Sequence, residues 1–329
     1  MKTNKIIIVL LIAAAVVLGT VFLSMRGREI QGPYLTITET ETTDEEADEM
    51  ISNCYTYEIG KERLKKQGEV SNTAGYPLTL YSTKKGKVLY IAYSGNGDQL
   101  YQSAKRKAEQ MTDQFCGFNH MFQCQDQLFM AAKYLEHYCI EPVMLDLTSN
   151  EITQLLIDKS DDTFTWSTSC DPKNNRIVFS CYSDSEMRAK LDFFDGDPER
   201  KEYPGNPKSK IYLYYIEKGE LKQVFDTSEY LYGIAVDDKN IYYSAGKSSL
   251  SPKGENQLMR VSIKTGEEEL VPCPISITGD MAVWNNELYC VGWMGDQRGC
   301  YRFHLKTGAI KEIYSAPENG FLNGMSMSY

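Results

Sequence analysis

The chain has 329 residues, of which 42% are hydrophobic and 24% are charged, and its 35 basic and 45 acidic side chains give a net charge of −10. This composition is that of a globular protein, and it excludes a disordered, collagen-like or coiled-coil chain. The length allows one large all-β domain with an appendage. The acidic balance argues against nucleic acid as a partner, because polyanions repel an acidic surface.

The first feature along the chain is an apolar stretch without charge, Ile6–Leu23, which continues through Met25. A helix over residues 6–25 is about 30 Å long, which matches the hydrocarbon core of a bilayer. We therefore expect a cytoplasmic tail over residues 1–5 and a transmembrane signal anchor over 6–25, with the remainder outside the cytoplasm. A cleaved signal peptide is the alternative, although the apolar run is longer than in such peptides and no small-residue cleavage motif follows it.

An acidic polar segment follows the apolar stretch. Residues 36–49 read TITETETTDEEADE and show no apolar periodicity. Such a composition is typical of a solvated segment, so we expect a spacer over residues 26–50.

From residue 51 to residue 329 the sequence repeats. In the two clearest copies, a strand at 240–244 or 287–291 is followed by a second strand at 258–263 or 301–305 and then by a Lys-Thr-Gly turn. Four strands per unit at a period of about 40 to 45 residues indicate a β-propeller blade. We therefore predict an all-β fold of six four-stranded blades, with five as the alternative.

Only five copies are complete, so a sixth blade has to be shared between the two ends of the domain. We expect the segment Gly320–Tyr329 to give its innermost strand and Cys54–Val70 to give its outer strands. Joining the ends in this way hides strand edges that would otherwise template aggregation.

The repeat carries a family resemblance. The run Asn-Ile-Tyr-Tyr-Ser at 240–244, with the later pattern Leu258-x-Arg260 and Lys-Thr-Gly-Glu at 264–267, resembles the six-bladed bacterial propellers of the TolB-like and YWTD-like kind. The YWTD tetrapeptide itself is absent. The resemblance implies an extracytoplasmic propeller that acts by binding or scaffolding, since enzymes are a minority of that group.

The connections of a propeller divide between two faces. Tight turns such as 237–240, 264–266 and 306–308 belong to one face, and the longer connections belong to the other, where we place function. These longer connections are residues 132–142, 183–209, 245–256 and 292–299. In the longest of them, Phe193 and Phe194 form a candidate docking patch for a partner.

The innermost strands line the central channel. We place them at residues 117–122, 163–168, 231–236, 279–284 and 320–325. The residues that this placement puts near the channel mouth are His120, Trp166, Tyr232, Asp280 and Asn323. Aromatic and hydrogen-bonding side chains suit a saccharide, a peptide or another small polar ligand, and a channel filled only with water is the alternative.

Catalytic motifs are absent from the sequence. It contains no G-x-S-x-G elbow, no phosphate-binding loop and no H-E-x-x-H pair, and its acidic run at 192–197 lacks the spacing of a calcium loop. Three histidines are too few for a histidine-rich site. We therefore expect no cofactor and no metal. A membrane-anchored binding module for a protein, peptide or saccharide is favoured, and a carbohydrate-active enzyme using channel carboxylates is the alternative.

The nine cysteines include no C-x-x-C pair. Cys290 and Cys300 lie on either side of a turn at Gly295, so they are a candidate disulfide across a hairpin, which an exported compartment would permit. The alternative is that both are small buried hydrophobic residues.

Overall fold

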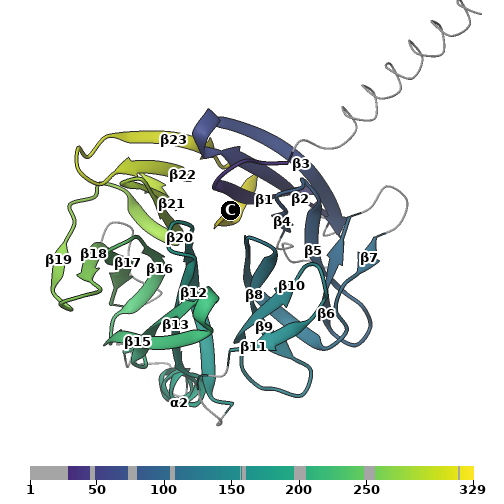
Figure 1. Cartoon of the computed structure of the whole chain (residues 1–329), viewed down its shortest axis with the longest axis horizontal. Coiled ribbons are helices and arrows are strands. Elements are labelled where there is room, and N and C mark those ends of the chain that lie inside the picture. The colour runs from purple at the N-terminus through teal and green to yellow at the C-terminus, as the bar shows by residue number, and fades with distance from the viewer. Residues whose placement is uncertain are drawn as a thin grey trace, which may run out of the picture.

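The computed structural model describes residues 29–44, 49–72, 80–103, 108–155, 157, 161–195, 205–247, 256–317 and 319–329. These residues form six antiparallel sheets of four strands each, arranged around a common centre (Figure 1). The predicted all-β propeller with six blades is therefore confirmed, and the alternative of five blades is wrong.

The blades follow one another in sequence, and the strands of each blade are named from the innermost outward. Blade 1 contains β24 (Gly320–Ser328), β1 (Tyr34–Asp44), β2 (Glu49–Glu58) and β3 (Arg63–Asn72). Blade 2 contains β4 (Leu80–Ser82), β5 (Val88–Tyr93), β6 (Asp98–Gln102) and β7 (Glu109–Gln110). Blade 3 contains β8 (Phe115–Cys124), β9 (Gln127–Tyr134), β10 (Glu141–Asp146) and β11 (Ile152–Gln154).

The second half of the ring repeats this order. Blade 4 contains β12 (Thr163–Asp171), β13 (Arg176–Ser183), β14 (Ser209–Tyr215) and β15 (Glu220–Thr227). Blade 5 contains β16 (Tyr230–Val236), β17 (Asn240–Gly246), β18 (Gln257–Ser262) and β19 (Glu268–Leu270). Blade 6 contains β20 (Ser276–Trp284), β21 (Glu287–Met294), β22 (Gln297–His304) and β23 (Ile310–Ser315). The predicted innermost strands are confirmed in blades 3 to 6 and in β24.

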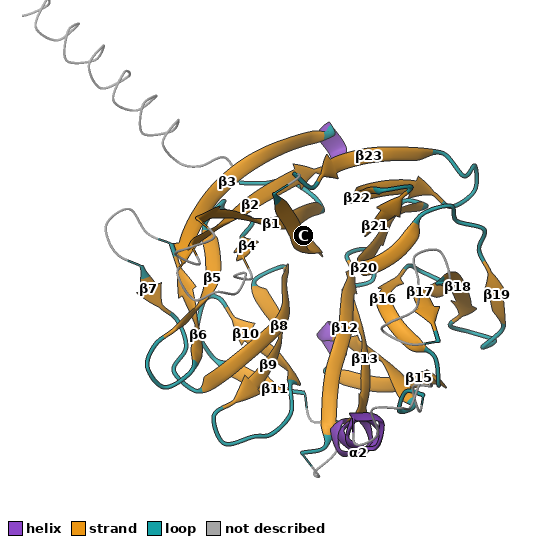
Figure 2. Cartoon of the chain, turned by 180° about the vertical axis from the view of Figure 1, so that it is seen from behind, coloured by secondary structure: helices purple, strands orange, loops and turns teal. Residues whose placement is uncertain are grey.

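Three short helices accompany the strands in the described part of the chain. The helix α2 (Asp184–Asp195) connects β13 to β14 and lies at the edge of the ring (Figure 2). Two single turns, η1 (Ile59–Lys61) and η2 (Ile216–Lys218), connect the third and fourth strands of blades 1 and 4. Among the described residues, no helix is long and apolar enough to cross a membrane. The predicted tail (1–5) and membrane span (6–25) lie outside the described residues.

The ring closes as expected, by a blade built from both ends of the domain. Strand β24 pairs antiparallel with β1, from Tyr34 opposite Ser328 to Glu41 opposite Gly320. The hydroxyl of Tyr81 in blade 2 donates to Ser328 Oγ over 2.6 Å, and the backbone NH of Gln123 in blade 3 donates to the same oxygen over 3.0 Å. Blades 1, 2 and 3 are thereby joined by buried hydrogen bonds.

The predicted spacer is wrong for its central part. Residues Tyr34–Asp44 form strand β1, the second strand of blade 1, and its residues 34–40 are buried on both faces. Its buried hydroxyl groups are partnered: Thr38 Oγ1 donates to the carbonyl of Leu80 over 2.8 Å, and Thr40 pairs with Ser52 over 2.8 Å. Because these hydroxyls are satisfied inside the fold, a polar sequence forms a buried strand.

The core lies between the blades. Four aromatic rings stack from blade 3 into blade 4, with centroid separations of 4.9 Å for Phe122 and Phe129, 6.1 Å for Phe129 and Phe179, and 5.7 Å for Phe179 and Tyr212. All four side chains are buried. Because aromatic burial and offset stacking fix the spacing of adjacent sheets, this stack positions the connections that leave blades 3 and 4.

Candidate functional site

The central channel is crossed by a contact between a histidine and an aspartate. His120 of blade 3 and Asp280 of blade 6, which lie on opposite sides of the ring, approach to 3.2 Å between Nδ1 and Oδ1. The other carboxylate oxygen of Asp280 accepts the backbone NH of Met325 over 2.8 Å. Asn323 lines the same pocket and donates from Nδ2 to Thr40 Oγ1 over 2.7 Å. Three of the five predicted channel residues are therefore brought together.

The space that remains beside the His120–Asp280 contact is small. The pocket lined by His120, Asp280 and Asn323 has a volume of about 50 Å³, whereas sites for small molecules measure about 300 to 1,000 Å³. A water molecule takes about 30 Å³ of liquid volume. Asp280 is the single carboxylate among the described residues that line the pocket. A glycosidase needs two carboxyl groups flanking the bond that breaks, so this pocket does not favour the enzymatic alternative.

The other two predicted channel residues lie in a separate aromatic cluster between blades 4 and 5. Trp166 donates from Nε1 to the carbonyl of Leu231 over 2.8 Å, and its ring lies 6.1 Å from the ring of Tyr230. Tyr230 in turn lies 5.1 Å from Tyr232. The indole NH of Trp166 is thus already partnered within the protein, and this ring ties one blade to the next.

A rim of exposed apolar side chains marks the face on which the second and third strands of the blades are connected. The described part of the chain contains seven exposed large hydrophobic side chains, and all but Leu270 lie in or beside these connections. The six residues of this apolar rim are Tyr93, Leu135, Tyr138, Leu191, Phe193 and Met294. Isolated exposed hydrophobic residues are common on proteins, but these six all lie on one face, on blades 2, 3, 4 and 6, which makes this face the candidate interaction surface.

Phe193 of the predicted docking patch belongs to this rim. Its side chain is 60% exposed near the end of α2, while the side chain of Phe194 lies outside the described residues. Helix α2 begins where Ser183 Oγ accepts the backbone NH of Glu186 over 3.1 Å. Asp162, from the connection between blades 3 and 4, accepts the backbone NH of Ser185 over 2.7 Å. These bonds fix the start of the helix that carries Phe193.

Arg188 of α2 also holds Tyr138 in place on the rim. The guanidinium carbon of Arg188 lies 4.3 Å from the centre of the Tyr138 ring, and Arg188 Nη1 donates to the Tyr138 hydroxyl over 3.0 Å. Tyr138 is nevertheless 58% exposed. An exposed aromatic ring held by fixed contacts loses little side-chain entropy on binding, which favours its use in a protein interface.

One of the predicted long connections is instead a tight hairpin. Strands β21 and β22 continue to Met294 and Gln297, so only Gly295 and Asp296 lie between them. In this register Cys290 lies opposite Tyr301, and Cys300 lies opposite Val291. The offset of one residue sends the two cysteine side chains to opposite faces of the sheet.

The predicted disulfide between Cys290 and Cys300 is therefore wrong. All nine cysteines are among the described residues, and all nine are free. Cys290 and Cys300 are fully buried and pack in two different core clusters. Burial raises the pKa of the Cys290 thiol well above its usual value, which makes it a small hydrophobic residue rather than a nucleophile.

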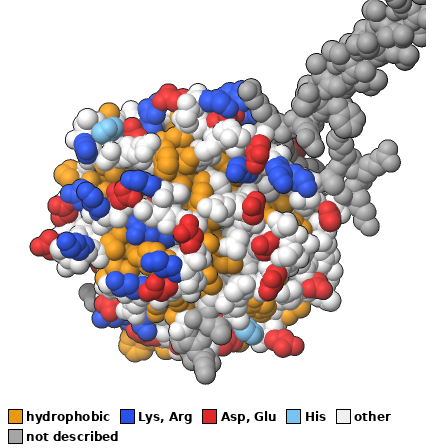
Figure 3. Space-filling view, viewed as in Figure 1, with side chains coloured by type: hydrophobic (Ala, Val, Ile, Leu, Met, Phe, Trp, Pro, Cys, Tyr) orange, Lys and Arg blue, Asp and Glu red, His pale blue; other side chains and the backbone are white. Residues whose placement is uncertain are grey.

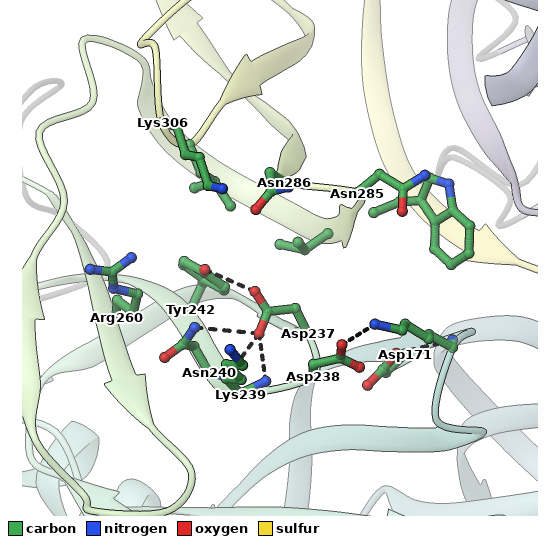
Figure 4. A pocket seen from close by; sticks show the side chains of 14 residues that line it. Asp171, Asp237, Asp238, Lys239, Asn240, Tyr242, Arg260, Asn285, Asn286 and Lys306 are labelled. Carbon is green, nitrogen blue, oxygen red and sulfur yellow. Dashed lines mark hydrogen bonds and ion pairs between the residues drawn. The ribbon is translucent and has the colours of Figure 1, made fainter.

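A larger cavity lies on the opposite face, among the tight turns of blades 4, 5 and 6 (Figure 4). Its volume is about 380 Å³. Lys306 and Asn286 lie on one side of it, and Asn240, Tyr242 and Arg260 lie on the other. The sequence did not reveal this cavity, because each turn that lines it is explained by its local structural role.

Most of the charges in this cavity are partnered within the protein. Asp237 accepts the backbone NH groups of Lys239 and Asn240 over 2.8 Å each and the hydroxyl of Tyr242 over 3.0 Å. Hydrogen bonds from Lys173 and Asn174 lower the pKa of Asp238. Figure 3 likewise shows basic and acidic side chains interspersed over the half of the ring that contains blades 5 and 6. The cavity therefore offers little net charge for the selection of a ligand.

Comparison with known proteins identifies the fold. No family model matches the chain, and no curated protein matches it. Among solved structures, TolB from Acinetobacter baumannii matches over 92% of this chain and 68% of its own, with 15% identity and a TM-score of 0.55. The nidogen/laminin complex matches over 91% of this chain and 99% of its own, with 10% identity and a TM-score of 0.54. The resemblance is one of fold. The fold therefore agrees with the predicted resemblance to TolB-like and YWTD-like propellers.

Proposed function

We propose that this protein is a membrane-anchored, extracytoplasmic module that binds a protein partner through the apolar rim. The observation that carries this proposal is the concentration of exposed apolar side chains on one face of the ring. Covering such a surface with a partner stabilises the complex by about 25 cal/mol for each Å² of apolar area removed from water. The rigid blades hold the rim residues in fixed relative positions, which reduces the entropic cost of binding.

A protein partner fits the remaining observations better than a small ligand does. The channel pocket of about 50 Å³ is too small for a sugar ring. The acidic chain, with a net charge of −10, disfavours nucleic acid. One structural neighbour is a complex of two proteins, nidogen and laminin, which supports a protein as the class of partner. An enzyme acting on carbohydrates has the weaker support, because the channel pocket supplies one carboxylate.

Photocrosslinking tests the apolar rim directly. We expect a photoreactive amino acid placed at position 193 or position 138 to give a discrete protein adduct in cells, because Phe193 and Tyr138 are exposed on the rim. The matched control is position 270, since Leu270 is 55% exposed but lies in β19, the outermost strand of blade 5. Mass spectrometry identifies the adduct.

A second variant distinguishes specific docking from chance contact. Once the adduct has identified the partner, co-purification with chains that carry no photoreactive residue is measured. The double change Tyr138→Ser and Phe193→Ser should reduce recovery of the partner at least tenfold, whereas Leu270→Ser should leave it unchanged. Equal adducts at all three positions, or none on the rim, would contradict the proposal.

The membrane anchor in this proposal rests on the uncharged stretch Ile6–Leu23. We expect the protein to stay in the membrane fraction after alkaline carbonate extraction, because a helix of this length and apolarity is stable only in a bilayer. We also expect the mature chain to begin before residue 6. Release into the soluble fraction, or an N-terminus beyond residue 25, would show that the segment is a cleaved signal instead.

A further inference from the structure

A loop and a strand of blade 3, together with the connection from blade 3 to blade 4, bring together three side chains that can bind a metal. His137 lies in the connection between β9 and β10, Glu141 begins β10, and Asp161 precedes β12. One ring nitrogen of His137 and one carboxylate oxygen from each acid all lie within 4.8 Å of one another. The closest pair, His137 Nδ1 and Glu141 Oε1, is separated by 3.1 Å.

From this arrangement we propose that His137, Glu141 and Asp161 form a site for a divalent transition-metal ion, with Zn²⁺ as the best match. One imidazole nitrogen and two carboxylate oxygens are ligands that zinc accepts, with bonds of about 2.0 to 2.2 Å. The nitrogen ligand disfavours Ca²⁺ and Mg²⁺, which prefer oxygen ligands. Water would occupy the fourth position of a tetrahedral site.

The spacing of the three donors suits this ion after a small adjustment. Two ligands of a tetrahedral zinc ion lie about 3.3 Å apart, as follows from bonds of about 2.05 Å. The pair His137–Glu141 is already at 3.1 Å. The remaining separations are at most 4.8 Å, and rotation of the partly exposed His137 side chain can shorten those that involve its ring nitrogen.

The two carboxylates are oriented by neighbouring groups. Asp161 Oδ2 accepts the backbone NH of Tyr138 over 2.9 Å, and its Oδ1 accepts the backbone NH of Cys139 over 3.3 Å. Gln154 donates from Nε2 to Oε2 of Glu141, and Oε1 of the same carboxylate contacts His137 Nδ1. Such outer contacts hold ligands in position for a metal. They also bring two negative charges close together, and a divalent cation would relieve their repulsion.

The site goes beyond the proposed function and is independent of it. The sequence conceals it, because its residues 137, 141 and 161 come from separate elements and match no metal motif. A bound ion would join the connection that carries Tyr138 to the segment that leads into blade 4. The metal ligand His137 and the rim residue Tyr138 are neighbours in the chain, so metal binding would also restrict the position of Tyr138.

A zinc titration tests the site. The full chain, in detergent and without a histidine tag, is stripped with EDTA, exchanged into buffer and titrated with Zn²⁺ against a chromophoric chelator. We expect one equivalent to bind, and we expect His137→Asn and Asp161→Asn each to weaken binding at least tenfold. Asp161→Asn removes the charge and keeps one oxygen, which can still accept the stronger of the two amide contacts, that of Tyr138.

His304→Asn is the matched control. His304 is another partly exposed histidine, and its Nδ1 accepts the backbone NH groups of Lys306 and Thr307 over 3.2 Å each, a role that asparagine can retain. This variant should bind zinc as the unmodified chain does. Circular dichroism melting without metal shows whether each variant is folded. Absence of a stoichiometric site, or zinc binding that survives both His137→Asn and Asp161→Asn, would overturn the proposal.

Discussion

Replacing Gly233 with alanine should destabilise the protein by about 3 kcal/mol or more. Gly233 lies in β16, where a Cβ atom would come within 2.2 Å of the carbonyl oxygen of Gly279 and 2.9 Å of Met281 Cγ, both in β20. Rotation of a side chain cannot relieve the first contact, because its partner is backbone. The innermost strands of blades 5 and 6 would have to separate, and overpacking of a rigid interior typically costs about 1 to 3 kcal/mol or more.

Urea unfolding measures this effect, with Gly60→Ala as the control. A Cβ atom added at Gly60 would meet no other atom within 4 Å, and this glycine does not have a positive φ. Alanine there should leave the midpoint unchanged or raise it slightly, because it restricts the unfolded chain. A Gly233→Ala protein as stable as the unmodified protein would mean that β16 and β20 can move apart at little cost.

The second large effect is expected at a buried ion pair. Arg176 Nε donates to Asp171 Oδ2 over 2.9 Å, and the two side chains are only 7% and 4% exposed. The guanidinium also donates from Nη2 to the carbonyl of Asp237 in blade 5. Replacing Arg176 with methionine leaves the Asp171 carboxylate buried without its cation, which costs about 3 to 5 kcal/mol.

A double-mutant cycle distinguishes the loss of the ion pair from the loss of packing. The variant Arg176→Met with Asp171→Asn should unfold at a higher urea concentration than Arg176→Met alone, since the buried charge is then gone. Asparagine at 171 can still accept the backbone NH of Lys173, which Asp171 accepts over 3.1 Å. If the double variant is the less stable of the two, the arginine acts by packing rather than by charge.

The propeller fold could be predicted from the sequence because its blades are encoded by a sequence repeat. The period and the Lys-Thr-Gly turns predicted the blades, and those turns close as expected, with the backbone NH of Gly266 donating to the carbonyl of Ser262 over 2.8 Å. Strand β1 was not predicted, because alternating threonine and acidic residues are typical of a solvent-exposed segment. Glu39 in that strand is fully buried, and burial raises the pKa of its carboxyl group.

The candidate site was predicted only in part, since it depends on how separate elements meet. The sequence placed His120 and Asp280 on innermost strands, but their approach to 3.2 Å depends on the width of the whole ring. Helix α2 had a local signal that could have revealed it, because Ser183 and Glu186 have the spacing of a capping box. The disulfide prediction failed on strand register, where a shift of one residue reverses the direction of a side chain.

The shared blade also determines when the protein can finish folding. Strand β1 is made early in synthesis, yet its partner β24 begins at Gly320, at the far end of the domain. At about 5 to 20 residues per second, the ribosome needs roughly a quarter of a minute to a minute to reach that strand. Until then the edge of β1 stays unpaired and can pair with another chain. The nascent chain is therefore prone to aggregation until β24 emerges, and slow ring closure, rather than the formation of single blades, should limit its yield.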